Sequence, residues 1–203
     1  MQFIKLILIT LLLACSSVQA DVGMITQLSG EASIAGSSGS QAAVPFLKLA
    51  TGDKITLANG TRLQIVYFGN GRQEVWKGGG QIEVGGLESK SALKPDVSQL
   101  PPLVVNQLAK TPAAGQQGKA GMVRVRSLGN PDAAAHLDKQ YADLKRNAAA
   151  GDTTPEVYLL SGLVELKEFA RAKTLLSDLS GKTGYKSVVE HFTPVVNAGA
   201  ASK

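Results

Sequence analysis

Hydrophobic and polar residues alternate with a period of two along short segments in the first half of the chain. Within residues 61–68 the apolar side chains on one side are Leu63, Ile65 and Tyr67. Alternation over so few residues is typical of β-strands with one buried face. The pattern therefore predicts an all-β region over residues 21–93.

Two Asn-Gly pairs predict turns within this region. The first pair is Asn59-Gly60 and the second is Asn70-Gly71, and each lies between two segments with the alternating pattern. Asn-Gly readily adopts the positive φ angles of tight hairpins. Two such turns so close together predict an antiparallel meander.

The apolar spacing becomes helical after Pro131. In the first predicted helix it follows intervals of four, three and four residues, at Leu137, Tyr141, Leu144 and Ala148. Thr154 and Phe169 begin two further predicted helices. A short fourth helix is expected to stop near Pro194 and to leave residues 195–203 frayed.

Residues 94–126 separate the two patterns and are rich in proline and glycine. This composition predicts a linker, although the apolar positions between Leu100 and Leu108 would also suit packing on a neighbouring domain. The fold class expected is α+β with two modules. An all-β module over residues 21–93, expected as an antiparallel meander, a β-roll or a sandwich, is followed by a small α-helical bundle over residues 127–203.

The first twenty residues have the composition of an export signal. Lys5 gives a basic start, residues 6–14 form an apolar run, and small residues lead to Ala20. The apolar run is shorter than the roughly 20 residues of a membrane span. We therefore expect residues 1–20 to be a signal peptide and the mature chain to be periplasmic.

Cys15 is the only cysteine of the chain and offers a second interpretation. The segment from Leu12 to Cys15 is similar to a bacterial lipobox, in which the cysteine is acylated and becomes the new N-terminus. Cleavage after Ala20 would instead release a diffusing protein without any cysteine, so the mature chain would hold no intramolecular disulfide.

Charge is distributed unevenly along the chain, whose formal net charge is +5. Residues 94–126 carry five Lys and Arg residues, Arg124 and Arg126 among them, against Asp96 alone. This basic segment could contact anionic lipid or wall polymer, or it could be a solvated linker. Nucleic acid is not an expected partner outside the cytoplasm.

Three stretches of the β region, residues 22–32, 52–57 and 61–68, resemble the FecR-like periplasmic domain. They share its opening strand and its central arrangement of a Gly-Asp turn between strands. The resemblance covers about residues 22–93 and implies a β fold and a periplasmic compartment. It does not imply transmembrane signalling, because a signal peptide stands where the sensors of that family have a spanning helix.

One pair of predicted helices resembles a tetratricopeptide (TPR) unit. The second half of that repeat matches the spacing of Phe169, Ala172, Leu176 and Leu179. The first half departs from the repeat, because the small residue that the repeat usually has near the position of Leu160 is missing. Since the chain has no second copy, we expect a small bundle with a TPR-like hairpin that offers a groove to a partner peptide.

No catalytic motif stands out in the sequence. His136 and His191 lie in separate helical segments, without a second His or Cys within helical reach, so no metal site and no cofactor are expected. Glu74 and Glu83 are expected on adjacent strands, where they would be a carboxylate pair or two solvated side chains. Their pairing would support an envelope hydrolase as an alternative function.

Tyr67 and Trp76 are the aromatic pair best placed to act together, because they are expected on neighbouring strands. They would either form a stacking platform for a sugar or peptide or fill the core. The function that we expect is an exported, non-enzymatic binding or scaffold protein of the bacterial cell envelope, which recognises a protein partner or an envelope polymer. A lipid-anchored structural lipoprotein, attached through acylated Cys15, is the other alternative.

Overall fold

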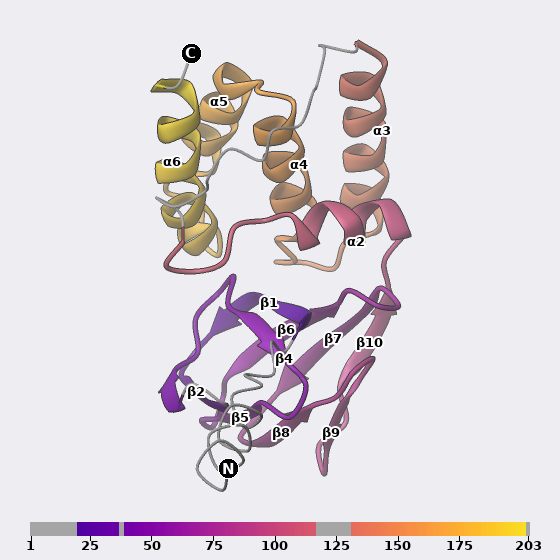
Figure 1. The fold of residues 1–203 in the computed structure, drawn as a ribbon, viewed down its shortest axis with the longest axis vertical. Coiled ribbons are helices and arrows are strands. Elements are labelled where there is room, and N and C mark those ends of the chain that lie inside the picture. The colour runs from indigo at the N-terminus through magenta and orange to yellow at the C-terminus, as the bar shows by residue number, and fades with distance from the viewer. Residues whose placement is uncertain (1–19, 37–38, 117–130, 202–203) are drawn as a thin grey trace, which may run out of the picture.

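A computed structural model describes residues 20–36, 39–116 and 131–201 of the 203-residue chain. An all-β region comes first and a helical region follows it (Figure 1). This confirms the predicted α+β class with two modules.

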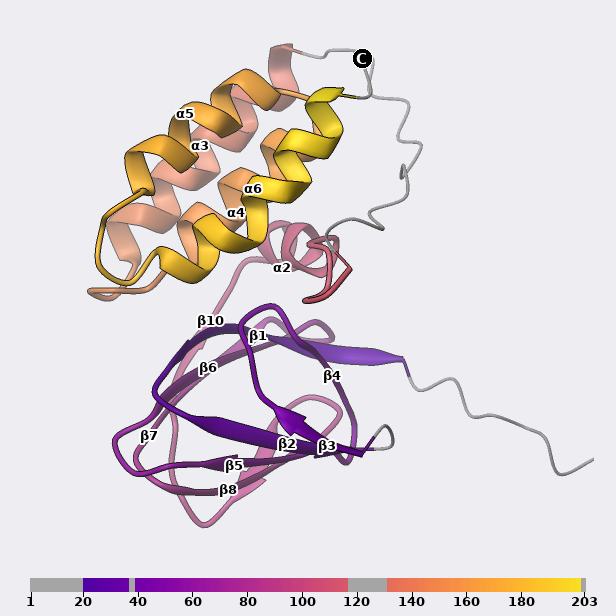
Figure 2. The same ribbon diagram turned by 90° about the vertical axis from the view of Figure 1, so that its left-hand side faces the viewer.

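The described strands form two antiparallel five-stranded sheets that pack face to face (Figure 2). Sheet A has the order β10-β7-β6-β1-β4, with β1 (Asp21–Ser29), β4 (Lys48–Ala50), β6 (Arg62–Tyr67), β7 (Arg72–Lys77) and β10 (Asp96–Gln99). Sheet B has the order β3-β2-β5-β8-β9, with β2 (Ala32–Gly36), β3 (Gly39–Ala42), β5 (Lys54–Leu57), β8 (Gly80–Val84) and β9 (Ser89–Ser91).

The two Asn-Gly turns have different roles. Asn70-Gly71 joins β6 to β7, which pair in register, so this predicted hairpin is confirmed. Asn59-Gly60 instead connects β5 of sheet B to β6 of sheet A, so the meander across this turn is wrong and the sandwich, which was also expected, is the arrangement found. The chain crosses between the sheets at this turn, and both strands can then bury one face in the same core.

The core of the sandwich lies between the inner faces of the two sheets. Period-two alternation brings aliphatic side chains of both sheets together there, including Ile25, Leu63 and Ile65 of sheet A and Ile55 and Ile82 of sheet B. All five are fully buried, as expected for aliphatic residues that alternate along strands with one face in the core.

Five helices are described, α2 (Pro102–Ala109), α3 (Pro131–Asn147), α4 (Thr154–Glu165), α5 (Phe169–Leu179) and α6 (Lys186–Ala201). Helix α2 crosses the space between the sandwich and the other helices (Figure 1). A Cβ atom on Gly162 of α4 would lie 2.3 Å from Leu137 Cδ1 of α3. Glycine at this position therefore lets α3 and α4 approach closely.

The first part of the predicted linker is ordered structure. Residues 96–99 form β10, which pairs with β7, and residues 102–109 form α2. Helix α2 buries Val104, Val105 and Leu108, as the packing alternative for this segment expected. The proline-rich composition misled the prediction, because Pro101 and Pro102 stand where a proline is compatible with the start of a helix. Residues 117–126 lie outside the described residues.

Helix α6 is longer than predicted. It continues through Pro194 to Ala201, so the prediction of a frayed tail after Pro194 is wrong for the residues up to 201. Val195 and Val196 are buried, and Val196 belongs to the cluster that the helices form. Their burial offsets the backbone hydrogen bond that a proline inside a helix removes.

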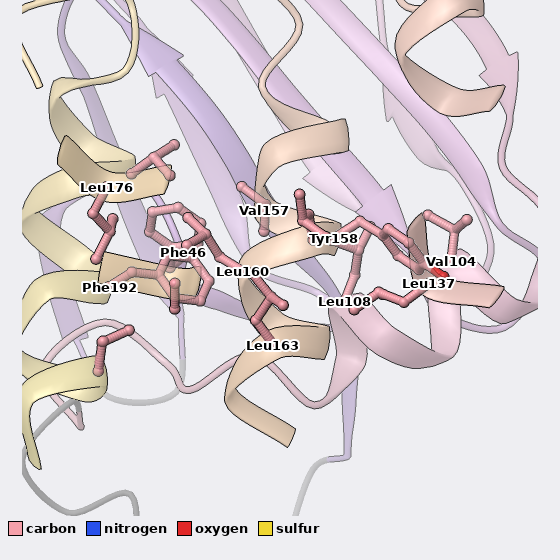
Figure 3. Close-up of a cluster of buried hydrophobic side chains, with 14 of the residues drawn as sticks. Phe46, Val104, Leu108, Leu137, Val157, Tyr158, Leu160, Leu163, Leu176 and Phe192 are labelled. Carbon is pink, nitrogen blue, oxygen red and sulfur yellow. The ribbon is translucent and has the colours of Figure 1, made fainter. Parts of the chain in front are cut away.

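A second hydrophobic cluster spans both modules. Met24 and Val66 project from the outer face of sheet A, and Phe46 projects from the loop before β4, into a cluster formed mainly by helical side chains (Figure 3). Phe46 is 1% exposed and packs edge-on against Phe192 of α6, with ring centroids 5.9 Å apart. The sandwich and the helices therefore share one apolar seam.

None of the helices that the structure describes is long and apolar enough to cross a membrane. The predicted signal peptide lies almost entirely in residues 1–19, which are outside the described residues.

Candidate functional site

A cleft lined by both polar and apolar residues lies between sheet A and the helices. Its floor is the outer face of β6, β7 and β10, and its opposite wall is the C-terminal part of α3 with the loop that leads to α4. The cavity volume is about 580 Å³. The lining residues are Arg62, Gln64, Gln73, Val75, Lys77, Asp96, Val97, Ser98, Gln99, Leu100, Pro101, Gln140, Asp143, Leu144, Asn147, Ala148, Ala149, Ala150, Asp152, Thr154 and Pro155.

Strand alternation explains why the floor of the cleft carries polar side chains. Leu63 and Trp76, a register pair of β6 and β7, point into the sandwich. Their neighbours along the strands, such as Gln64 and Val75, must then point outward to the helices. Sheet A consequently has a largely apolar inner face and a floor rich in carboxamide side chains on its outer face.

Asp152 fastens this floor to the helical module. Its Oδ1 accepts hydrogen bonds from Gln64 Nε2 at 3.0 Å and from the Thr154 backbone N–H at 2.9 Å. Its Oδ2 accepts one from Gln73 Nε2 at 3.2 Å. Gln27 of β1 adds a hydrogen bond from its Nε2 to the Gly151 carbonyl at 2.8 Å. One short loop therefore ties three strands to the start of α4.

Several buried oxygens near this loop have no hydrogen-bond donor among the described residues. They are Gln27 Oε1, Gln64 Oε1 and Thr153 Oγ1. Gln64 is fully buried, and its Nε2 is already used by Asp152 and by Thr154 Oγ1 at 2.8 Å. Leaving such an acceptor unpaired costs about 1–3 kcal/mol. Of these three residues only Gln64 lines the cleft, so its Oε1 is the one unpaired acceptor of the three that belongs to the cleft lining.

The other end of the cleft carries an ion pair. Lys77 Nζ lies 2.6 Å from Asp96 Oδ2, where β7 and β10 lie side by side. The hydrogen bond and the charge of Lys77 lower the pKa of the Asp96 carboxyl, and Arg62 adds a smaller effect in the same direction. Both members of the pair are mostly exposed, so the pair is worth little for stability.

Tyr67 and Trp76 do not form a ligand platform. They are 0% and 1% exposed and fill the core of the sandwich, as the alternative interpretation held. The Tyr67 hydroxyl lies 2.6 Å from Ser89 Oγ. Burial raises the pKa of Tyr67 to about 12, which keeps its hydroxyl protonated at neutral pH.

Glu74 and Glu83 do not form a carboxylate pair. Glu74 is on β7 of sheet A and is fully buried, whereas Glu83 is exposed on β8 of sheet B. The expectation of adjacent strands is wrong, because the chain changes sheets after β7.

The buried carboxylate of Glu74 has structural partners instead. It accepts hydrogen bonds from Arg72 Nε at 2.7 Å, from Trp76 Nε1 at 3.1 Å and from the Ser89 backbone N–H at 3.2 Å. The bond from Ser89 connects β7 of sheet A to β9 of sheet B, whereas Arg72 and Trp76 lie on β7 itself. The geometry gives Glu74 a role in holding the two sheets together and leaves the hydrolase alternative without its pair.

The remaining candidate residues are dispersed. His136 is exposed on α3, whereas His191 of α6 is 4% exposed and stacks on Phe46 with ring centroids 4.0 Å apart. Within the part of the chain that the structure describes, no group of His, Cys, Asp or Glu is arranged to hold a metal ion. Arg124, Arg126 and Cys15 lie outside the described residues.

The cleft was not predicted from the sequence. One signal was available, because Val66 and Phe68 are apolar on the face of residues 61–68 that lies opposite Leu63, Ile65 and Tyr67. That face is buried under the helices, so β6 is covered on both sides. The second wall belongs to a distant segment and could not be placed from local patterns.

Comparison with known proteins finds no family model, no curated protein and no solved structure that matches this chain. The FecR-like and TPR-like resemblances therefore stay predictions.

Proposed function

We propose that this protein is exported to the bacterial cell envelope, where it is a non-enzymatic binding or scaffold protein. The N-terminal leader pattern supports export, with Asp21 as the first residue of the mature chain. The partner would be an envelope protein or polymer that enters the cleft between sheet A and α3.

The observation that carries this proposal is the construction of the cleft. Side chains of both modules meet in it, and the Asp152 carboxylate fixes their relative position through two hydrogen bonds, from Gln64 and Gln73 of the sandwich. Buried polar groups held in this way form a preorganised surface, which lowers the ordering cost of binding. Nearby acceptors such as Gln64 Oε1 offer unused hydrogen-bonding capacity.

Export is tested by mass spectrometry of the protein purified from fractionated cells. We expect a periplasmic product that begins with unmodified Asp21. An acylated Cys15 at the N-terminus would instead support the lipoprotein alternative. A full-length product with its leader in the cytosol would contradict the proposal.

Binding in the cleft is tested by photo-crosslinking in living cells. A photoreactive amino acid replaces Gln140, which lines the cleft, and in a matched control it replaces Lys173, an exposed residue of α5. We expect a discrete adduct from position 140 that position 173 does not give. The same adducts from both positions, or none from position 140, would contradict a binding role for the cleft.

A further inference from the structure

Strand β10 is the outermost strand of sheet A on the side of α3 (Figure 1). It pairs with β7 along its whole length, and among the described residues no strand pairs with its other edge. All four of its residues are exposed, and Val97 is 49% exposed. The edge is therefore open to another strand.

The opposite edge of sheet A is protected. Strand β4 is only three residues long, its pairing with β1 contains a register shift, and its central Leu49 is buried. Strand β10 is also short, with four residues, but all of them are exposed and its register with β7 runs without interruption. Its one charged residue, Asp96, is paired with Lys77. The edge thus lacks a bulge and a buried centre, which protect the opposite edge from strand addition.

The direction of the free backbone groups on β10 follows from one hydrogen bond. The Leu100 backbone N–H donates to the Gly71 carbonyl at 2.9 Å, on the β7 side. Backbone groups of successive residues in a strand point to alternate sides, so those of Ser98 also point to β7. The N–H and C=O groups of Val97 and Gln99 therefore point outward.

We infer that this edge takes an extended peptide segment of a partner protein, which adds a strand to sheet A beside the cleft. The inference rests on the proposed function and names its ligand. A peptide main chain would pair with Val97 and Gln99, and its alternate side chains would face the wall formed by α3. Peptide is favoured over glycan, because none of the residues described as lining the cleft offers an aromatic face for stacking.

The test uses a phage-displayed library of random twelve-residue linear peptides, selected against the mature protein. Enriched peptides are synthesised, and their Kd is measured by isothermal titration calorimetry. The Val97→Pro variant removes one outward N–H and leaves the hydrogen bonds to β7 in place, as a proline on an edge strand allows. We expect it to weaken binding by about tenfold or more, since a main-chain hydrogen bond and the fit of the strand are both lost.

Two controls keep this result interpretable. Val97→Thr retains the N–H and should bind like the original protein, and thermal unfolding reports whether Val97→Pro still folds. Amide hydrogen exchange supplies a readout that does not depend on any variant. A bound peptide should slow exchange at the amides of Val97 and Gln99, while Ser98 should change little.

Three results would overturn the inference. Enriched peptides could bind Val97→Pro as tightly as the original, or no peptide could be enriched above background. Sedimentation could also reveal a dimer that Val97→Pro dissociates, which would show that a second copy occupies the edge. If the position-140 crosslink persisted in Val97→Pro, the proposed binding function would stand while the peptide assignment failed.

Discussion

The carboxylate of Glu74 shows how much a single buried group can hold together. It accepts three hydrogen bonds, and the one from the Ser89 backbone joins the two sheets. The carboxylate is fully buried, whereas the side chain of Arg72 is 27% exposed. Removing the acceptor would leave the Trp76 and Ser89 N–H groups without their present partner, at the desolvation cost of each group.

We therefore predict that Glu74→Ala lowers the free energy of unfolding by about 3–5 kcal/mol. Glu83→Ala, at an exposed position, should change it by less than about 1 kcal/mol. Urea denaturation monitored by Trp76 fluorescence gives both values. Equal effects of the two substitutions would contradict the structural role of Glu74.

His191 makes the seam between the modules sensitive to acid. Burial lowers the pKa of His191 to about 4 from an ordinary value of 6.5. The charge of Lys48 acts in the same direction, and a hydrogen bond to the Pro112 backbone opposes both effects. Because the folded protein disfavours the protonated ring, its contribution to stability is complete above pH 6.5 and is lost as the pH falls toward 4.

We predict a loss of up to about 3 kcal/mol of unfolding free energy between pH 6.5 and pH 4 from this group. Urea denaturation at a series of pH values measures it. His191→Phe keeps an aromatic ring opposite Phe46 and removes the titration, so the difference between the two pH profiles isolates His191. Parallel profiles for the two proteins would show that His191 does not titrate in this range.

At the scale of elements, the two Asn-Gly turns differ in what surrounds the glycine. Gly60 and Gly71 have φ angles of 77° and 73°, a region that residues with a Cβ atom rarely adopt. A Cβ atom on Gly60 would meet nothing within 4 Å, whereas one on Gly71 would lie 2.7 Å from the Leu100 carbonyl oxygen. Gly71 also accepts the hydrogen bond that anchors the end of β10.

We predict that Gly60→Ala costs about 1 kcal/mol of unfolding free energy, from the backbone conformation alone. Gly71→Ala should cost at least about 1 kcal/mol more, because the backbone of Leu100 must also shift. Thermal or urea unfolding of the two variants compares them directly. A smaller loss for Gly71→Ala than for Gly60→Ala would contradict the close packing at the start of α2.

Elements with a strong local pattern were predicted well, and those that depend on distant contacts were not. The periodic apolar positions identified α3, α4 and α5, and Asn70-Gly71 identified the hairpin of β6 and β7. The length of α6 was missed, because burial of Val196 outweighs the local effect of Pro194. Strand β10 was missed because its four residues are all exposed and show no alternation.

At the scale of the whole molecule, the candidate site is a product of tertiary structure. Gln64 of β6 donates a hydrogen bond to Asp152 of the loop before α4, although the two residues are far apart in the sequence. No local sequence pattern predicts such a contact. Tyr67 and Trp76, for which the sequence allowed either a ligand platform or a place in the core, are core residues. The two modules were recognised correctly, but their shared seam was not.

The apolar seam between the modules is the central structural feature, because the cleft and the proposed peptide site at β10 require a fixed relation between the sandwich and the helices. Met24, Phe46 and Val66 of the β region are buried with helical side chains in one cluster. Differential scanning calorimetry of the mature chain tests this arrangement most directly. We predict one unfolding transition whose calorimetric and van't Hoff enthalpies agree, whereas two separate transitions would contradict it.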